Sequence, residues 1–560
     1  MGERTAPLSQ NLLTRLSQAD LLRFRRDGFW AEETLHDLAR VRAEARPDAV
    51  AIRDGGCTLT WAELTALAET LAADLRAAGL RPGDRVAAWL SPRVETAAVL
   101  LACSREGWVC CPSLHRNHTV GEIEALLVRM NAAALVAETG YGADAARADV
   151  FAAAEALPSM RRTIRLAPPA PRTGAEIAAA FAVPDSGAEA PPPAGAADHV
   201  VYLAFTSGTT GQPKGVMHSN NTLLANARAL AGDWGFDAAS VIYTLSPLSH
   251  NLGFGAMVLG MLTGAELAIH DLPRGASLLA RLRELGATFV FGVPAHAMDL
   301  LAEVEAAGDA ALPALHGFRI SGAAAPRPLV EGLLSYGVRP QSGYGMTEAC
   351  SHHYTLPDDP PAAIAGTSGR ACPGYEIAIF DVEDPDRPAP QGEIGQIGGR
   401  GASLMLGYFD DQGATERSFN REGWFLTGDL GRMDAEGRLQ ITGRIKDIII
   451  RGGHNIHPAR IEALADRFPG VERAAALPVK DERLGEKVCL VVMPRNGAEI
   501  DPDGLLAHLD AQGLSRYDMP EFFLQVPEIP LGPSGKMLKR ALLPEIAAGR
   551  LAPQPIRFRG

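Results

Sequence analysis

The chain has 560 residues, and this length predicts at least two domains because it exceeds one ordinary hydrophobic core. Hydrophobic residues make up 47% and charged residues 21%, as in soluble globular enzymes. The formal net charge of −13 is unlike the basic face of a nucleic-acid-binding protein, so we predict no nucleic-acid partner. Any anionic substrate must then be held by local groups rather than by the overall field.

The cysteines and the apolar runs argue against a secreted protein and against a membrane-spanning protein. The seven cysteines have no metal-ligand spacing, so we predict reduced, mostly buried thiols and a cytoplasmic location. Residues 1–30 carry charges throughout and have no apolar core, which is unlike a secretory signal. Residues 241–265 lack charges, but Pro247, His250 and Asn251 interrupt them, so we predict a buried loop and helix and no membrane span.

Helix and strand patterns alternate along the first half of the chain. Thr60 and Glu63 form a capping box before a helical run that ends at Gly79, and the apolar stretch "RVAAWL" follows as a strand. A second helix ends at Gly286 and is again followed by a β-rich run. This alternation predicts an α/β fold whose layers contain β-sheets with many parallel strands.

Two composition changes divide the chain. Residues 167–198 are rich in Pro, Ala and Gly and predict a flexible surface connection. After "GRIKDIIIRGG", short strands and one helix predict a small α+β domain that begins near Lys446. We therefore expect an N-terminal extension (1–30), a large domain (31–445) and a small domain (446–560).

The stretch "TSGTTGQPKG", Thr206 to Gly215, follows an apolar run and combines glycines, hydroxyls and Lys214. Glycines let backbone N–H groups approach an anion, hydroxyls add donors, and the lysine supplies a positive charge. The stretch does not fit the Walker A pattern, which argues against a phosphate-transferring P-loop enzyme. The alternative is an ordinary Gly/Ser turn between a strand and a helix.

This stretch resembles the signature loop of the adenylate-forming (AMP-binding) enzymes, which include the acyl- and aryl-CoA synthetases. Four further motifs of that superfamily follow in its order, and the resemblance covers residues 35–543. The N-terminal half, with "CPSLHRNHTVGEIEALL", is most similar to cyclohexanecarboxylate-type acid–CoA ligases. The resemblance implies that the small C-terminal domain is mobile.

The second motif is "QSGYGMTEA" and the third is "TGDLG". The resemblance implies that Tyr344 lies against adenine, that Thr347 contacts phosphate and that Glu348 holds Mg²⁺. It also implies that Asp429 accepts hydrogen bonds from the ribose hydroxyls. Taken alone, Glu348 would be a solvated surface residue and Asp429 an ordinary turn residue.

The fourth motif is "ITGRIKDIIIRGGHNIHPARIE". In the family, Arg444 binds ribose or phosphate oxygens, and Lys446 stands at the hinge between the domains. Gly452 and Gly453 would line the pantetheine tunnel after the small domain has turned. His454 stands where many relatives have Glu, so it is given no role.

The fifth motif, "PLGPSGKMLKRALLPEI", contains Lys536. The resemblance assigns it the catalytic role of bridging the substrate carboxylate and the α-phosphate, where a cation offsets the repulsion of two anions. Without the family it would be a surface lysine. The stretch also resembles sites of regulatory acetylation, which would remove the charge, and implies an acetyltransferase and a deacetylase as partners.

The acyl pocket is expected at "SPLSHNLGFG", with His250, Asn251 and Phe254 as its candidate residues. In aryl-acid adenylating relatives an Asn at the place of Asn251 reads an ortho hydroxyl, but Ala256 stands where their supporting hydroxyl residue is expected. His250 could equally be a core histidine. The predicted walls are small or apolar and fit a compact ring or a medium-length chain.

The sequence therefore predicts an ATP-dependent carboxylic acid–CoA ligase for an alicyclic, aromatic or medium-chain acid, which forms an acyl-adenylate and releases pyrophosphate and AMP. The alternative is an acyl-AMP ligase that loads a separate carrier protein with, for example, a 2,3-dihydroxybenzoate-type acid. A non-catalytic sensor on this fold would lack some of the motif residues, whereas Thr347, Glu348, Asp429, Arg444 and Lys536 are all present. The oligomeric state, including a homodimer, stays open. The expected ATP- and CoA-binding residues are Thr206, Ser207, Gly208, Thr209, Thr210, Lys214, Tyr344, Asp429, Arg444, Gly452 and Gly453.

Overall fold

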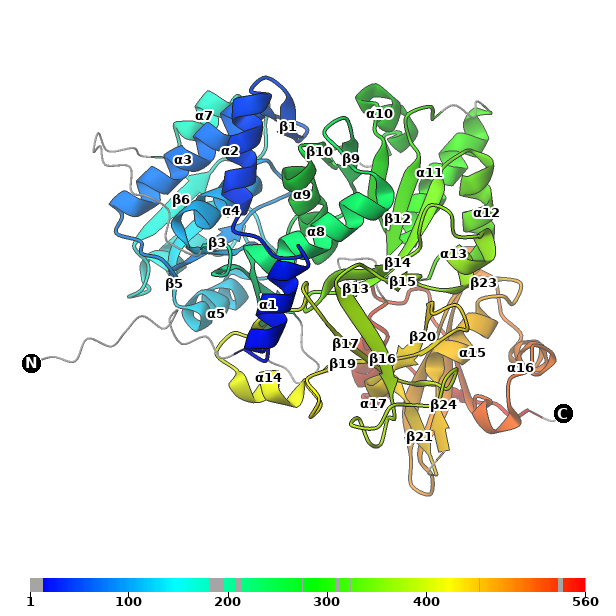
Figure 1. The fold of residues 1–560 in the computed structure, drawn as a ribbon. Helices are drawn as coiled ribbons and strands as arrows, with labels where there is room; N and C mark the ends of the chain where they lie inside the picture. The colour runs from blue at the N-terminus through cyan, green and yellow to red at the C-terminus, as the bar shows by residue number, and fades with distance from the viewer. Residues whose placement is uncertain are drawn as a thin grey trace, which may run out of the picture. The chain divides into compact units, whose positions relative to one another are not determined.

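The computed structural model describes residues 14–181, 196–206, 213–273, 275–308, 312–322, 324–452, 454–531 and 537–558 (Figure 1). The chain divides into two compact units. The first holds residues 1–376 and 400–419, and the second holds 377–399 and 420–560. The predicted α/β fold class, with a large N-terminal and a smaller C-terminal part, is confirmed. The predicted domain limits, with a break at Lys446, stay predictions.

The first unit contains two sheets in which most neighbouring strands are parallel. The first sheet pairs β1, β10, β9, β11, β12 and β13 in parallel and adds antiparallel strands at its two ends. Its order is β15 (Arg370–Ala371), β14 (Cys350–Tyr354), β13 (Arg339–Met346), β12 (Gly317–Ser321), β11 (Phe289–Gly292), β9 (Val241–Thr244), β10 (Glu266–Ile269), β1 (Val50–Arg53), β2 (Thr58–Thr60).

The second sheet of this unit is parallel from β7 to β6 and antiparallel at β8 and β18. Its order is β18 (Gly407–Tyr408), β8 (Lys214–Ser219), β7 (Val200–Thr206), β4 (Val109–Cys111), β3 (Arg85–Trp89), β5 (Ala132–Glu138), β6 (Arg162–Leu166). The segment "TSGTTGQPKG" therefore connects two antiparallel strands, whereas the alternative reading placed it between a strand and a helix.

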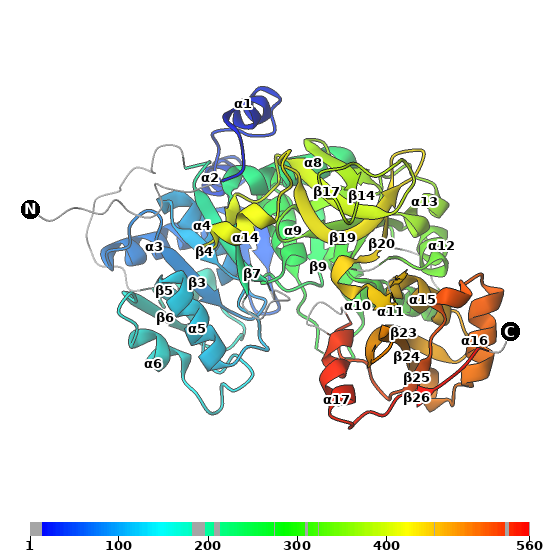
Figure 2. The ribbon, with the colours of Figure 1, turned by 90° about the horizontal axis from the view of Figure 1, so that it is seen from below.

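Helices cover both sheets of the first unit. Leucine- and valine-rich faces of α10, α11 and α12 form one core with β9, β11 and β12, and α5 and α6 form another with β3–β5 (Figure 2). The helices are α1 (Gln18–Arg26), α2 (Leu35–Ala45), α3 (Trp61–Ala77), α4 (Glu95–Glu106), α5 (Val120–Met130), α6 (Val150–Glu155), α7 (Gly174–Ala178), α8 (Asn220–Trp234), α9 (Asn251–Thr263), α10 (Leu278–Leu285), α11 (Pro294–Ala307), α12 (Arg327–Ser335), α13 (Pro361–Gly366) and α14 (Gln412–Arg417).

Local sequence signals mark several of these elements correctly. Thr60 caps α3 with the reciprocal hydrogen bonds of a capping box with Glu63, and Gly79 follows the helix with a φ of +85°. Gly286 ends α10 in the left-handed conformation before β11. These caps confirm the helix–strand alternation predicted for both stretches.

The uncharged run 241–265 forms the predicted loop and buried helix α9, and its first residues form the strand β9, which was not predicted. Helix α8 is also buried on nearly all sides, since it packs against β7 and β8 of one sheet and β14 of the other. A helix that is buried all round needs apolar or hydrogen-bonded residues on every face. Among the described helices, none combines the length and the apolar character that a membrane span requires.

The described part of the N-terminal extension folds onto the first unit. Phe24 and Trp30 pack with Ala225 and Ala402, and the indole N–H of Trp30 donates to the carbonyl of Ala402 at 2.9 Å. Arg23 pairs with Glu376 at 3.0 Å. The extension thus ties α8 and the segment around residue 402 to the start of the chain.

The predicted flexible connection is wrong for its first part. Residues 174–178 form α7, and Ile177 and Phe181 are buried. Arg172 forms ion pairs with Asp54 at 2.6 Å and with Glu95 at 2.8 Å. The composition signal missed these charged and apolar anchors, and residues 182–195 lie outside the described part of the chain.

Glu95 is the centre of this buried ion network. Its carboxylate also accepts hydrogen bonds from Arg93 at 2.8 and 2.6 Å. Burial alone would raise the pKa of Glu95, but the hydrogen bonds from Arg93 and Arg172 outweigh it and hold the pKa below its ordinary value. The network therefore stabilises the fold above the ordinary Glu pKa and loses this contribution as the pH falls.

The second unit contains two sheets. One has the order β16 (Tyr375–Phe380), β17 (Gly395–Gly401), β19 (Phe425–Met433), β20 (Leu439–Arg444). The other has the order β22 (His454–Ile456), β21 (Ile449–Arg451), β24 (Gly485–Pro494), β25 (Phe522–Gln525), β26 (Gln554–Pro555), with β23 (Val471–Asp481) paired to β24.

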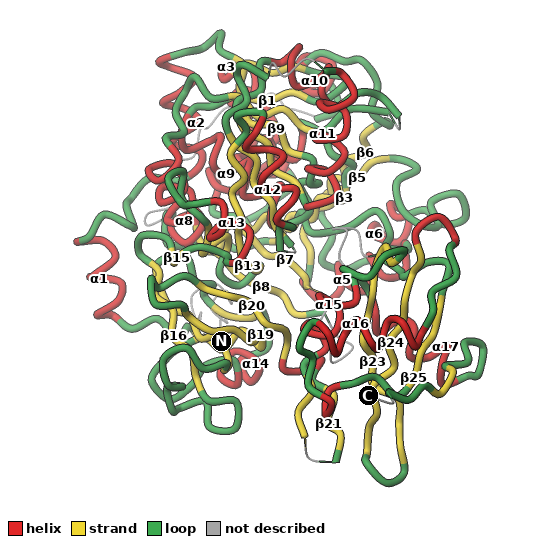
Figure 3. Tube along the Cα trace, turned by 90° about the vertical axis from the view of Figure 1, so that its right-hand side faces the viewer, coloured by secondary structure: helices red, strands yellow, loops and turns green. Residues whose placement is uncertain are grey.

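Helices flank the sheet of β23 and β24, as the predicted small α+β domain requires. Apolar residues of α15 (Pro458–Ala465) and α16 (Pro502–Ala511) form a core on one face, and the segment leading to α17 (Leu543–Ala547) packs against the other (Figure 3). All seven cysteines of the chain are free and buried, which confirms the prediction for the thiols.

We expect the substitution Arg172→Ala to lower the free energy of unfolding by about 3–5 kcal/mol, because it removes the arginine that pairs with buried Asp54 and one of the two that pair with buried Glu95. The matched control is Arg165→Ala, whose side chain is 51% exposed and whose ion pairs should contribute about 1 kcal/mol or less. Urea unfolding of both variants measures the difference. Equal losses in the two variants would show that the Arg172 network is not a stabilising anchor.

Candidate functional site

The hairpin of β7 and β8 carries the ends of the glycine-rich segment. Thr206 ends β7 and Lys214 begins β8, and the two residues are direct partners across the strand pair. Ser207, Gly208, Thr209 and Thr210 lie outside the described residues. A Cβ at Gly215 would lie 3.0–3.2 Å from the side chains of Leu203, Phe205 and Phe409, so the close packing beside Lys214 favours glycine.

Lys214 lies beside an aromatic ring that connects it to Glu348. The Lys214 ammonium is 4.5 Å from the centroid of the Tyr408 ring, and the Tyr408 hydroxyl donates to Glu348 Oε1 at 2.9 Å. The backbone N–H of Met405 donates to the carbonyl of Glu348 at 2.7 Å. The structure thus brings together two predicted site residues through Tyr408, which sequence reasoning missed.

Thr347 and Glu348 lie in the tight turn between β13 and β14. A Cβ at Gly345 would lie 2.2 Å from the carbonyl of Cys350, so the turn requires glycine there. His218 of β8 reaches this turn, and its Nε2 lies 2.7 Å from the carbonyl of Thr347. A carbonyl only accepts, so Nε2 carries the hydrogen and Nδ1 accepts from Thr222 at 3.0 Å. Burial lowers the pKa of His218 to about 4, which keeps the ring neutral.

Tyr344 lies on β13, three residues before Thr347. Its half-buried ring meets the His352 ring edge to face, with the centroids 5.0 Å apart. His352 in turn stacks on Tyr375, with 4.5 Å between their centroids. A flat ring held in this way can support a second flat ring such as a purine.

Glu348 fits a divalent cation that also binds phosphate. Its carboxylate is a hard oxygen ligand close to Lys214, and Mg²⁺ prefers one or two carboxylates together with phosphate oxygens and water. Within the described parts of the chain, no group of three or more His, Cys, Asp or Glu residues is arranged to hold a metal ion without such oxygens. The residues present therefore fit a metal that arrives with a nucleotide.

The second unit brings Asp429 and Arg444 together. They are direct partners across β19 and β20, and Arg444 Nε lies 2.8 Å from Asp429 Oδ1. Asp429 is buried and follows Gly428, whose φ is +74°. An acidic and a basic side chain held side by side can together bind vicinal hydroxyls and a neighbouring phosphate oxygen.

Lys446 lies in a 3₁₀ turn, Ile445–Asp447, directly after Arg444. Burial and the charge of Arg444 lower the pKa of Lys446. Arg540 donates to the carbonyl of Lys446 and pairs with Asp447 at 3.2 Å. The turn is therefore held by the segment that follows Lys536.

Lys536 and Gly453 lie outside the described residues. Leu531 and Met537, on either side of residues 532–536, form an antiparallel β-bridge. Gly452 follows β21 with a φ of +58°, and its N–H donates to the carbonyl of Leu484 at 2.7 Å. His454 lies 2.8 Å from Asp518 Oδ1, a contact that gives it a structural role.

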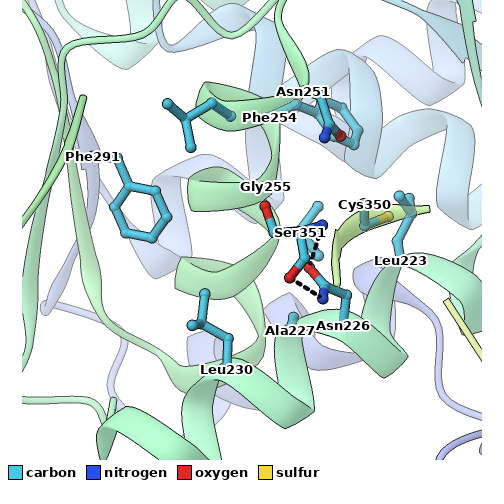
Figure 4. Close-up of a pocket in the computed structure, with 12 residues that line it drawn as sticks. Leu223, Asn226, Ala227, Leu230, Asn251, Phe254, Gly255, Phe291, Cys350 and Ser351 are labelled. Carbon is cyan, nitrogen blue, oxygen red and sulfur yellow. Dashed lines mark hydrogen bonds between the residues drawn. The ribbon is translucent and has the colours of Figure 1, made fainter. Parts of the chain in front are cut away.

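A small pocket lies between α8 and α9 (Figure 4). Its cavity volume is about 20 Å³, enough for a water molecule but not for a ring. The side chain of Asn226 donates to the carbonyl of Ser351 at 3.1 Å and accepts from its N–H at 3.2 Å. None of the described residues that line it is charged: Leu223, Asn226, Ala227, Leu230, Asn251, Leu252, Phe254, Gly255, Val258, Phe291, Cys350 and Ser351.

Two of the three predicted pocket residues line this cavity. Asn251 donates to the carbonyl of Met346 at 3.4 Å, and Phe254 stacks on Tyr202 with 4.1 Å between the centroids. His250 is not among the lining residues. It stacks on His115 at 4.2 Å with an angle of 12° between the rings.

His115 ties the loop before α9 to the second sheet. Its Nδ1 lies 3.1 Å from the Ser249 hydroxyl, and its carbonyl accepts from the Trp89 indole at 3.1 Å. Burial lowers the pKa of His250 to about 4 and is the main cause that lowers the pKa of His115 to about 3, so both rings are neutral. Two neutral rings can stack without charge repulsion. No motif or spacing in the sequence predicted this pair.

The chain is similar to known proteins over nearly all of its length. Residues 39–409 match the family described as AMP-binding enzyme, and residues 460–536 match the AMP-binding enzyme C-terminal domain. It is 31% identical to the medium-chain fatty-acid–CoA ligase of Escherichia coli, over 93% of this chain and 92% of the relative. It is 32% identical to a salicylyl-CoA synthase / salicylate adenylyltransferase of Streptomyces, over 93% of this chain and 95% of the relative.

A solved structure has the same fold. The ATP-bound crystal structure of MatB from Rhodopseudomonas palustris aligns with a TM-score of 0.77 and 29% identity, over 92% of this chain and 99% of that one. The first matched range contains the first two motifs, with Lys214, Tyr344 and Glu348, and the second ends at Lys536 of the fifth motif. The third motif and most of the fourth, with Asp429 and Arg444, lie between the two ranges.

We expect Tyr408→Phe to weaken the binding of Mg·ATP about tenfold, because it removes the hydrogen bond that orients Glu348 and keeps the ring beside Lys214. Isothermal titration calorimetry with Mg·ATP measures the change. Tyr517→Phe is the control, since this tyrosine is 72% exposed. An unchanged affinity for Tyr408→Phe would contradict the role of the Tyr408 hydroxyl.

Proposed function

The chain belongs to the AMP-binding enzyme family, in its acyl- and aryl-CoA synthetase branch, and we propose that it activates a carboxylic acid with ATP and passes the acyl group to CoA. The arrangement of Lys214, Tyr408 and Glu348 carries this proposal, because it places a cation and a carboxylate beside the glycine-rich segment. The lysine can bind phosphate, and the carboxylate can bind the divalent cation that accompanies it.

In the first half-reaction a carboxylate oxygen of the acid attacks the α-phosphorus of ATP, and the bond to the β-phosphate oxygen breaks. Pyrophosphate leaves, and an acyl-adenylate remains. Thr206 to Thr210 and Lys214 hold the departing phosphates, and Thr347 contacts the α-phosphate. Mg²⁺, held by Glu348, supplies charge neutralisation for the phosphates when bound.

Lys536 is the catalytic residue of this step. The attacking carboxylate and the α-phosphate repel each other, and an ammonium group at their junction stabilises the charge that builds up in the transition state. The position of Lys536 in the family's fifth motif and the match of residues 460–536 to the C-terminal domain support this role.

The adenosine part is held by groups from three motifs. Tyr344 offers its ring to adenine, and its contact with His352 supports that orientation. Asp429 accepts hydrogen bonds from the ribose hydroxyls, and Arg444 donates to ribose or phosphate oxygen. The ion pair between Asp429 and Arg444 supports this assignment, because each side chain fixes the direction of the other.

In the second half-reaction the thiolate of CoA attacks the acyl carbon, and AMP leaves. Lys446 is proposed as the hinge that lets Lys536 withdraw and lets Gly452 and Gly453 approach the pantetheine arm. Neither half-reaction needs a nucleophile from the protein. Positioning and electrostatics supply the catalysis.

We propose an aromatic or medium-chain acid as the substrate. The uncharged lining of the pocket supports an apolar body, and the Asn251 amide supports a hydroxyl or another polar group beside the reacting carboxylate. The names of the Escherichia coli and Streptomyces relatives support both classes. The second of these names also includes an adenylyltransferase, which keeps the transfer to a carrier protein as the alternative.

The proposal also covers the location, the regulation and the oligomeric state of the protein. A cytoplasmic location is supported by the free, buried state of all seven cysteines. Acetylation of Lys536 by a lysine acetyltransferase would remove the charge that the first step needs, and a deacetylase would restore it. A homodimer stays a proposal that native mass spectrometry can test.

A product screen by mass spectrometry tests the function. The protein is mixed with Mg·ATP, CoA and a pool of benzoates, cyclohexanecarboxylate and short and medium fatty acids. We expect an acyl-CoA that falls at least about 100-fold in the Lys536→Ala variant, because a central charge is lost. Acetylation of Lys536 should give the same loss, and deacetylation should reverse it.

The control is Lys480→Ala, an exposed lysine of the same unit, which should keep wild-type activity. Acyl-AMP without thioester, followed by transfer to a holo-carrier protein, would replace the CoA proposal with the alternative. Absence of both products would refute the proposed function, and activity unchanged by acetylation would refute the regulatory proposal.

A further inference from the structure

Arg319 is a fully buried arginine in the middle of the first sheet. It lies on β12, where its direct partners are Phe291 on β11 and Gln341 on β13. Partners in register on parallel strands point to the same face of a sheet. Arg319 therefore shares a face with Phe291, which lines the pocket between α8 and α9.

The Arg319 guanidinium is only partly satisfied. Its Nη1 donates to Gln341 Oε1, and its Cζ lies 5.6 Å from the centroid of the Tyr354 ring. Its Nε and Nη2 have no hydrogen-bond partner among the described residues, and no described carboxylate pairs with it. A Cβ on Gly343 would lie 2.6 Å from Nη2, so the group fits closely against this glycine.

More buried polar atoms without partners lie around Arg319. Gln341 Nε2 has none within the described chain, and neither do the Nε2 atoms of His352 and His353. The Nδ1 atoms of the two histidines lie 2.8 Å apart, so one ring donates there, and the ring that accepts keeps its hydrogen on Nε2. The pKa of His352 is lowered by burial, then by His353 and Arg319. The ring that donates has an Nε2 that can only accept, so the cluster offers one such acceptor and four unpaired donor atoms: Arg319 Nε and Nη2, Gln341 Nε2 and one histidine Nε2.

Besides Phe291, the residues Asn226 and Cys372 also connect this cluster with the pocket. Asn226 lines the pocket, and its amide lies 3.8 Å from the Cys372 sulfur. The N–H of Cys372 donates to the carbonyl of His352, and Arg319 acts electrostatically on the Cys372 thiol. The pocket and the unpaired donors are therefore separated by the layer of Phe291, Asn226 and Cys372.

An isolated buried charge costs several kcal/mol, so a guanidinium in this position needs a counter-charge. Burial lowers the pKa of Arg319 to about 10, and the group is still charged at neutral pH. The Tyr354 ring offers a weak partner, and its hydroxyl already donates to Asp233 at 2.8 Å. The described residues supply no anion, and an anion from a ligand would complete the site.

We propose that Arg319 and Gln341 form a second anion subsite at the inner end of the pocket, and that the acid substrate carries a second carboxylate that binds there. This inference rests on the proposed function, because it specifies which acid the enzyme activates. The cavity of about 20 Å³ must open when any acid binds. A diacid would open it toward Arg319, with the reacting carboxylate at the opposite end, on the side of Asn251.

Paired substrates test the subsite. Adipate is compared with hexanoate, and terephthalate with benzoate, at constant ionic strength. We expect the wild type to favour the diacid of at least one pair by tenfold or more in kcat/KM. Arg319→Leu should lose this preference and keep or improve its activity on the monoacid. Arg327→Leu is the control, since its side chain is 71% exposed and lies outside the proposed site.

Thermal unfolding tests the same site without catalysis. The preferred diacid should raise the melting temperature of the wild type and not that of Arg319→Leu, and this variant should melt no lower than the wild type without acid. If Arg319→Leu does not fold, Gln341→Leu takes its place and should reduce the diacid preference severalfold.

Three results would overturn the inference: a wild type that prefers the monoacids, an equal loss on both acids in Arg319→Leu, or equal thermal shifts in both proteins. Each would mean that water satisfies the buried donors. A diacid-dependent thermal shift without any acyl-CoA product would instead refute the proposed function and keep the subsite.

Discussion

The hydrogen bond from His218 to the carbonyl of Thr347 joins the two sheets of the first unit at the site. His218 lies on β8, the strand that begins at Lys214, and Thr347 lies in the turn after β13. Lys214 and Glu348 thus come from different sheets, and without a fixed contact their separation would vary with every movement between the sheets. A buried neutral imidazole suits this role because it has one donor and one acceptor, and Thr222 satisfies the acceptor. The contacts of Tyr408 and Met405 with Glu348 then fix the rest of the turn.

The charged side chains at the proposed phosphate site and the uncharged lining of the pocket agree with the proposed reaction. Lys214 and Glu348 lie at the proposed phosphate site, while the described lining of the pocket is uncharged. An apolar body is held best where water is excluded, and two reacting anions need a cation only at their junction. Arg319 departs from this pattern, since it is a buried charge behind an uncharged wall. A buried charge without a partner is retained only where a ligand or water meets it.

Local signals in the sequence predicted the local structure well. The capping box of Thr60 and Glu63, Gly286 after α10 and the interrupted run 241–265 each act within a few residues. The motifs identified Lys214, Glu348, Asp429 and Arg444 as separate site candidates, and the structure shows that Lys214 and Glu348 both contact Tyr408 and that Asp429 pairs with Arg444. The partners His218, Tyr408 and Arg319 were missed because each acts on a residue that is remote in the chain or on an adjacent strand. Composition misled at residues 167–181, where a few anchoring side chains outweigh the Pro and Ala content.

The proposed function depends on attack of the acid on the α-phosphorus of ATP. The most direct test uses an acid whose two carboxylate oxygens are ¹⁸O, in a complete reaction with Mg·ATP and CoA. Because the bond formed in the first step joins a carboxylate oxygen to the α-phosphorus, we predict one ¹⁸O in the AMP and none in the pyrophosphate. Label in inorganic phosphate or in pyrophosphate, or unlabelled AMP beside a labelled thioester, would contradict it.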